Sequence, residues 1–147
     1  LDEDYYFLPT DARQRDGRWR PSSLVDWRDI VEGLEFARGR RILFIDTCHA
    51  GNAYHPRLEK DTADAEIYAL SATAPNNVAI ELPQLGHGVF TWSVLRGLNG
   101  EAAGADGEVS LYDLASFVSG EVPRLTEERQ LPFFNFAAGT DFPVTAR

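Results

Sequence analysis

The fold of this chain is decided by residues 40–51, which read RRILFIDTCHAG. Ile42 to Ile45 form a continuous apolar run with β-branched and aromatic members, a pattern typical of a strand that is buried on both faces. Strands of this kind usually belong to parallel sheets. Asp46 and Cys48 follow directly after this run. Both side chains are therefore predicted at the carboxyl end of the strand, where open α/β sheets bind their ligands.

Three other segments have the composition of strands, because they are short and rich in apolar residues. They are residues 5–8, 67–71 and 133–137. Residues 11–21 are rich in arginine and aspartate and are predicted to form an exposed polar loop. Residues 50–65 contain turn formers and charges but no periodic apolar stripe, so they are predicted to be a mobile loop.

A first helix is predicted from Leu24 to Leu34, where apolar residues recur at helical spacing. Ser23 and Asp26 have the spacing of a capping box at its start. Gly39 suits the stop at its carboxyl end.

Two more helices are predicted in the second half of the chain. Residues 89–98 carry aromatic and aliphatic side chains and run toward Gly100. Ser110 and Asp113 repeat the capping-box spacing ahead of another apolar stripe, and Pro123 is expected to stop that helix. Strands that alternate with helices of this length predict an α/β domain with a mostly parallel sheet and helices on both faces.

Composition restricts the class of protein further. A length of 147 residues with 44% hydrophobic residues suits one packed domain over residues 1–147. The formal charge of -9 repels nucleic acid and anionic membranes, so neither is expected as a partner. No apolar run approaches the roughly 18 residues of a membrane span. The single cysteine cannot form an internal disulfide, which indicates either a reducing, cytoplasmic location, the one expected here, or a thiol that is kept for chemistry.

Cys48 and Asp46 form the constellation with the clearest chemistry. Alternate strand residues point to the same side, so the carboxylate and the thiol are expected to share a cleft if the extended backbone continues to Cys48. An ordinary cysteine has a pKa of about 8.5, so a nucleophilic thiol needs a base or a cation nearby. The alternative is that Cys48 is an inert packing residue after a buried strand.

The residues DTCHAG at 46–51, after RRILFI, resemble the nucleophile strand of the caspase, metacaspase and orthocaspase group of cysteine peptidases. Residues 5–11, 70–73 and 87–91 resemble bacterial members of the group in order and spacing, so the likeness extends over nearly the whole chain. This resemblance implies a three-layer caspase-like fold. It also implies that Cys48 is the catalytic nucleophile, with its backbone amide contributing to the oxyanion hole.

The resemblance also implies a substrate class. In metacaspase-like members the acid two residues before the nucleophile belongs to the S1 pocket, and Asp46 matches it, so cleavage of peptides or proteins after Arg or Lys is expected. Ser71 is a second candidate for substrate binding. Animal caspases have glutamine at the position of Asp46, and an Asp-specific, caspase-type peptidase is kept as an alternative.

A catalytic histidine is the missing part of this prediction. In the family the His-Gly pair lies upstream of the region that residues 5–11 resemble, so these residues start after it. His49, His55 and His87 are all outside the family's position. We therefore expect a companion chain or segment to supply the histidine, and the sequence leaves proteolytic processing and truncation open as explanations.

Two rival interpretations remain open. One is a non-catalytic caspase-like module that binds partners, and the other is an unrelated thiol enzyme in which Cys48 pairs with His87. No cofactor and no metal ligand are expected. Calcium activation is left open, because acids such as Asp61, Asp64 and Glu66 lie near the predicted mobile loop.

Overall fold

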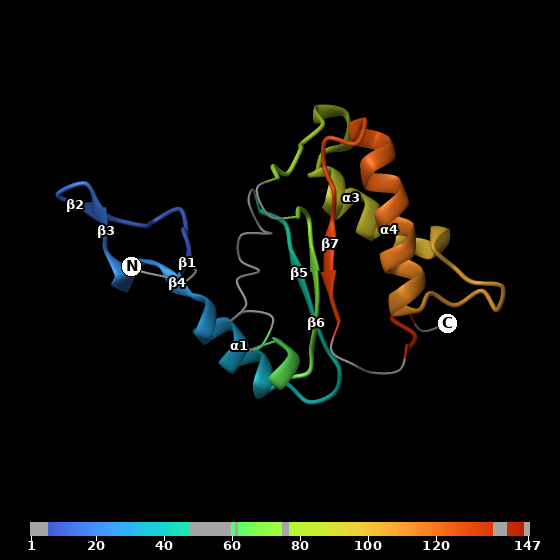
Figure 1. The fold of residues 1–147 in the computed structure, drawn as a ribbon, viewed down its shortest axis with the longest axis horizontal. Coiled ribbons are helices and arrows are strands. Elements are labelled where there is room, and N and C mark those ends of the chain that lie inside the picture. Colours follow the sequence, from blue (N-terminus) through green and yellow to red (C-terminus); the bar gives the residue numbers. More distant parts are fainter. Residues whose placement is uncertain (1–5, 48–59, 61, 75–76, 137–140, 146–147) are drawn as a thin grey trace. The chain divides into compact units, whose positions relative to one another are not determined.

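The computed structural model describes residues 6–47, 60, 62–74, 77–136 and 141–145 (Figure 1). The chain divides into two compact units, Leu1–Arg41 and Ile42–Arg147. Helices and strands occur in both, so the protein is of mixed helix and strand, compatible with the predicted α/β class. The single domain predicted over residues 1–147 stays a prediction.

Short antiparallel pairs form the strands of the N-terminal unit. The pairs are β1 (Tyr6–Phe7) with β4 (Val25–Asp26) and β2 (Gln14–Arg15) with β3 (Arg18–Trp19). The second pair is a hairpin inside the predicted loop. Asp16 and Gly17 form its turn with φ angles of 53° and 73°, the left-handed backbone that a tight hairpin turn requires. The hairpin residues are exposed, as predicted for the loop.

Helix α1 (Trp27–Glu35) begins later than predicted. Residues 25 and 26 belong to β4, and Asp26 is itself the N-cap, because its carboxylate accepts a hydrogen bond of 2.9 Å from the amide of Arg28. The predicted capping box of Ser23 with Asp26 is therefore wrong. The Ser23 hydroxyl instead donates to the carbonyl of Arg20 over 2.8 Å, within the 3-10 turn η1 (Pro21–Ser23).

Strands β5 (Arg41–Ile45), β6 (Ile67–Ser71) and β7 (Phe133–Asn135) form a three-stranded sheet in that order. β5 and β6 point in the same direction (Figure 1). β7 pairs antiparallel with β6, and Ser71 lies opposite Phe133. The described sheet is therefore mixed, and the prediction of a mostly parallel sheet is correct only for β5 and β6.

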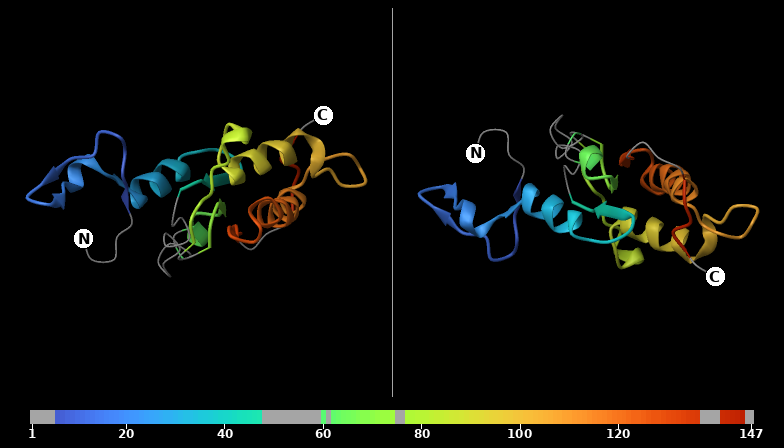
Figure 2. Two further views of the ribbon diagram at one scale, coloured as in Figure 1. Left: turned by 90° about the horizontal axis from the view of Figure 1, so that it is seen from above. Right: turned by 90° about the horizontal axis from the view of Figure 1, so that it is seen from below.

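One face of the sheet packs against α3 (Val89–Arg96) and α4 (Leu111–Thr126), which lie side by side (Figure 2). Leu70 and Ala72 contribute to this core from β6 and the residue after it. The helices contribute a larger apolar set, in which the fully or almost fully buried members are Val89, Phe90, Leu111, Leu114, Val118 and Val122. Burial of these side chains is the main force that fixes α3 and α4 on the sheet.

The opposite face of β6 is also buried. Ile67, Ala69 and Ser71 alternate with the core residues of β6 and have no exposed surface. On this face Asn135 of β7 donates a hydrogen bond of 2.8 Å to Thr62, which lies in a helical turn at residues 62–64. That turn lies within the predicted loop at 50–65, most of which is outside the described residues. β5 is less buried than predicted, because Phe44 is 39% exposed.

The ends of α4 test two features of the sequence pattern. The capping box predicted for Ser110 and Asp113 is confirmed, since the Ser110 hydroxyl accepts from the amide of Asp113 over 3.1 Å and the Asp113 carboxylate accepts from the amide of Ser110 over 3.2 Å. The predicted stop at Pro123 is wrong. The helix continues to Thr126 and ends at Glu127, which has a left-handed backbone with φ of 51°. A single proline removes one helical donor but leaves the rest of this last turn in place.

Gln130 joins three separate segments inside the C-terminal unit. Its side chain is fully buried, accepts a hydrogen bond of 2.8 Å from the amide of Ile80 and donates one of 2.9 Å to the carbonyl of Ala72. Its own amide donates to the Thr126 hydroxyl over 3.1 Å. Both polar ends of the amide side chain are thereby satisfied, as buried polar groups require.

Replacement of Gln130 by leucine is expected to lower the free energy of unfolding by roughly 2–4 kcal/mol, because it leaves the partly buried Ile80 amide and the buried Ala72 carbonyl without the Gln130 side chain. Urea denaturation measures the change. The matched control is Gln84→Leu at an exposed position, with an expected effect within about 0.5 kcal/mol. Equal effects of the two substitutions would contradict this role for Gln130.

Candidate active site

Asp46 directly follows β5, and its carboxylate turns toward the first turn of α3. The Thr91 hydroxyl donates a hydrogen bond of 2.5 Å to Oδ2 of Asp46. The Asp46 side chain makes no other hydrogen bond with the residues that the structure describes, and it is exposed. One carboxylate oxygen is thus fixed by the protein, while the group as a whole remains open to solvent.

Gly88 is the N-cap of α3 and lies against the same carboxylate. A Cβ atom built on Gly88 would lie 2.9 Å from Oδ2 of Asp46, closer than real Cβ contacts. The backbone of Gly88, with φ of -57° and ψ of 146°, suits any residue. A side chain at position 88 would therefore displace the Asp46 carboxylate from its present place.

A continuous set of hydrogen bonds connects the two sides of this contact. The Ala72 amide donates to the carbonyl of Ile45 over 2.8 Å, and the Val89 amide donates to the carbonyl of Ile80 over 2.9 Å. Gln130 bridges Ala72 and Ile80. The end of β5 and the start of α3 are consequently held together through buried bonds, and Asp46 meets α3 at a fixed place.

Ser71 occupies a different environment from Asp46, although both lie at the carboxyl ends of neighbouring strands. Its hydroxyl donates to the carbonyl of Thr73 over 3.3 Å and has no exposed surface. Ser71 belongs to the face of β6 that points away from α3, whereas the Asp46 carboxylate contacts α3. The structure does not bring these two predicted substrate-binding groups into contact, and binding by Ser71 stays a prediction.

Cys48, the predicted nucleophile, lies outside the described residues. Cys48 and Asp46 were expected to share a cleft only if the extended backbone continued through both residues. Strand β5 ends at Ile45, however, and Thr47 is at a bend. The Thr47 hydroxyl oxygen is buried and has no hydrogen-bond partner in the described part of the chain. A buried hydroxyl without a partner costs about 1–3 kcal/mol, so the residue next to Cys48 has an unfilled bonding position.

Of the three histidines, only His87 belongs to the described residues. It is exposed and, together with Glu81, Leu82 and Gly88, lines a hollow of about 310 Å³. Gly88 therefore borders both this hollow and the Asp46 carboxylate. His49 and His55 lie outside the part that the structure describes.

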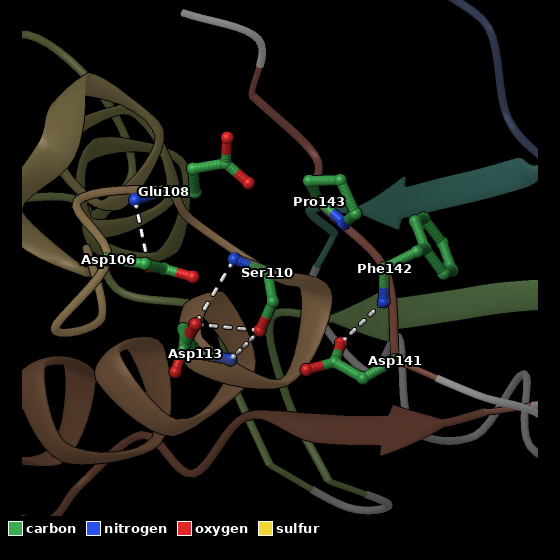
Figure 3. Close-up of a pocket in the computed structure, with 7 residues that line it drawn as sticks. All are labelled: Asp106, Glu108, Ser110, Asp113, Asp141, Phe142 and Pro143. Atoms are coloured by element: carbon green, nitrogen blue, oxygen red, sulfur yellow. Dashed lines mark hydrogen bonds between the residues drawn. The ribbon is translucent and has the colours of Figure 1, made fainter.

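A second hollow, of about 160 Å³, lies at the start of α4 and is acidic (Figure 3). Three of its four carboxylates already accept hydrogen bonds from the backbone. Asp106 accepts from the amide of Glu108 over 3.0 Å, Asp113 completes the capping box, and Asp141 accepts from the amide of Tyr112 over 3.1 Å. These bonds fix the backbone at the start of α4, so the acidic cluster has a structural role.

The chain positions described here contain no group of three or more His, Cys, Asp or Glu side chains arranged to hold a metal ion. Of the acids considered for calcium, Asp64 and Glu66 are exposed and Asp61 lies outside the described residues. No helix among the described residues has the length and apolar character needed to cross a membrane.

Comparison with known proteins identifies no relative, since the chain matches no protein-family model and has no significant match among curated proteins or solved structures. The interpretation of the site therefore depends on its own geometry and on the resemblance in residues 46–51.

Two residues of this site were missed by the sequence reasoning. Gly88 and Thr91 belong to residues 87–91, which were named only for their resemblance to bacterial members of the family. Their position at the start of a predicted helix was the one feature in the sequence that could have indicated a role, because the first turn of a helix favours a nearby carboxylate. The pairing with Asp46, 45 positions away, could not be read from local pattern.

Asp141 provides a pH test of the acidic hollow. Burial alone would raise the pKa of Asp141, but hydrogen bonds from the Ser110 side chain and from the amides of Tyr112, Phe142 and Leu111 outweigh it and lower the pKa. The unfolded value for aspartate is about 3.9. The stabilisation is therefore present above that pH and is lost as the pH falls through the lower, folded pKa.

Asp141→Asn is accordingly expected to lower the melting temperature at neutral pH and to reduce its fall between about pH 5 and pH 3, because the linked proton is removed. Thermal unfolding at several pH values measures both effects. Asp64→Asn, at an exposed position, serves as the control. An acid-side slope in Asp141→Asn as steep as in the wild type would contradict the assignment.

Proposed function

We propose that this chain is the greater part of a caspase-like cysteine endopeptidase that cleaves after Arg or Lys, with Cys48 as its nucleophile. The observation that carries the proposal is the exposed Asp46 carboxylate, held by Thr91 at the carboxyl end of β5, two residues before the single cysteine. In this proposal the described sheet, with α3 and α4 on one face, belongs to a three-layer caspase-like domain.

The environment of Asp46 suits recognition of a positive side chain. Its Oδ2 is bound to Thr91, while Oδ1 makes no hydrogen bond with other described residues. A guanidinium presents donors in a planar fork that a carboxylate binds well, and an ammonium also pairs with it. The charge of -9 over the chain further favours the approach of a basic segment.

The reaction follows the chemistry of a thiol nucleophile. The Cys48 thiolate attacks the carbonyl carbon of the basic residue, the C–N bond to the next residue breaks, and an imidazolium gives its proton to the leaving amine. A thioester remains on Cys48. Water then attacks the thioester with the imidazole as base, which releases the carboxylic acid and restores the thiol. The Cys48 amide would stabilise the oxyanion in both steps.

The histidine for this reaction belongs, in the proposal, to a companion chain or segment outside these residues. His87 is exposed in the hollow beside Gly88. Among the described residues the Thr47 hydroxyl, next to Cys48, has no hydrogen-bond partner, which is consistent with a further segment that binds it. The substrate is a peptide or protein in a cytoplasmic setting, and the chemistry needs no cofactor.

Fluorogenic peptides ending in Arg, Lys or Asp test this function on the full-length gene product. Turnover is expected for Arg and Lys peptides, with kcat/KM at least about 100-fold above that for Asp peptides, because only basic residues pair with Asp46. The matched variant Cys48→Ala is expected to lose at least about 1,000-fold in kcat. Turnover after Asp would favour a caspase-type specificity, and turnover by Cys48→Ala would remove the thiol mechanism. Binding of partners without any turnover would favour the non-catalytic module.

Asp46→Asn tests the specificity residue itself. The substitution keeps the shape of the side chain and removes its charge, so kcat/KM for Arg peptides is expected to fall roughly 100-fold. Ser71→Ala is the comparison at the second predicted residue, where the buried hydroxyl predicts a change of less than about fivefold. Undiminished cleavage of Arg peptides by Asp46→Asn would contradict the proposed S1 role.

A further inference from the structure

The first turn of α3 contacts the proposed specificity residue at two points. Thr91 binds Oδ2 of Asp46 through its hydroxyl, over 2.5 Å. Gly88 approaches the same oxygen with its backbone, so that a Cβ there would lie 2.9 Å from it. The Thr91 hydrogen bond holds the carboxylate against the helix. The absence of a side chain at Gly88 leaves the space that the carboxylate occupies.

α3 is suited to hold a group in place because it is itself firmly packed. Val89, Phe90 and Val94 are at most 6% exposed and belong to the core beneath the sheet. At the other end of the helix, Arg96 donates to Glu121 of α4 over 2.7 Å. Sites supported by rigid, packed elements orient their side chains more accurately than sites on loops.

The backbone at the start of α3 is tied to the sheet as well. The Val89 amide donates to Ile80, and the Ile80 amide donates to the buried side chain of Gln130, which also binds Ala72 beside the end of β5. Asp46 and Thr91 are therefore joined twice, directly by their hydrogen bond and indirectly through this buried path. A backbone shift of the end of β5 relative to the start of α3 would disturb that path.

We infer that Thr91 and Gly88 are positioning residues for the Asp46 carboxylate and thereby set the selectivity for a basic substrate residue; this inference rests on the proposed function. Thr91 fixes Oδ2 and orients the carboxylate, while Oδ1 remains available to the guanidinium or ammonium. Neither residue touches the scissile bond in this scheme, so loss of either weakens binding of the basic side chain more than it slows the chemical steps.

Thr91→Val removes the hydroxyl while keeping the shape of the side chain. For an Arg peptide its KM is expected to rise about tenfold with kcat within about twofold, because a misplaced carboxylate binds the guanidinium poorly. Competitive inhibition by benzamidine, a guanidinium mimic, is expected to weaken by a similar factor. Thr91→Ser, which keeps the hydroxyl, should restore both values. The rate of Cys48 alkylation by iodoacetamide should be unchanged in all three proteins.

Two further variants separate positioning from general damage to α3. Gly88→Ala should raise KM in the same direction, because its methyl group displaces the carboxylate. Ser93→Ala, which removes another hydroxyl of the same helix, one that donates to the carbonyl of Val89 over 2.8 Å, should leave KM for Arg peptides within about twofold. In a background of Asp46→Ala, Thr91→Val should have no additional effect on KM, since its partner is gone.

The outcomes distinguish this inference from the function on which it rests. If Asp46→Asn loses selectivity but Thr91→Val matches the wild type, the positioning role is overturned and the peptidase remains. An effect of Thr91→Val that persists undiminished with Asp46→Ala also overturns it, because the hydroxyl then acts elsewhere. If the wild-type full-length protein cleaves no Arg or Lys peptide, both proposals fail.

Discussion

The hydrogen bond from Thr91 to Asp46 is the constraint on which the site depends, because it joins the end of β5 to the start of α3. An exposed aspartate after a strand would ordinarily sample several rotamers, and each would present its charge differently. Binding one oxygen to a packed helix leaves one orientation favoured. The space for that orientation comes from Gly88, where any Cβ would crowd the carboxylate.

Gln130 gives this local contact its wider support. Its fully buried amide joins Ala72, which is hydrogen-bonded to the end of β5, with Ile80, which is hydrogen-bonded to the start of α3. The apolar core under α3 and α4 supplies most of the driving force for packing, while such polar bonds determine the relative placement of the segments. For the proposed peptidase this combination matters, because small displacements of a specificity group reduce rates considerably.

Sequence reasoning succeeded where the signal was local and periodic. β6 was predicted at residues 67–71, as observed, and the capping box of Ser110 was correct because its two members are three positions apart. It failed where distant segments decide the outcome. Residues 25 and 26 pair with β1 as strand β4, so α1 begins later than predicted. β7 pairs antiparallel with β6, so the sheet is mixed, and Pro123 lies inside the last turn of α4. The pairing of Thr91 with Asp46 was invisible for the same reason, since it is a tertiary contact.

The central claim is that Cys48 is a nucleophile served by a carboxylate that selects basic residues. Its most direct measurement is covalent labelling of the full-length protein with peptidyl chloromethyl ketones ending in Arg or in Asp, followed by peptide mass mapping. The account predicts an adduct on Cys48 that forms much faster with the Arg reagent and loses this preference in Asp46→Asn. Absence of an adduct on Cys48, or equal labelling by both reagents in the wild type, would contradict it.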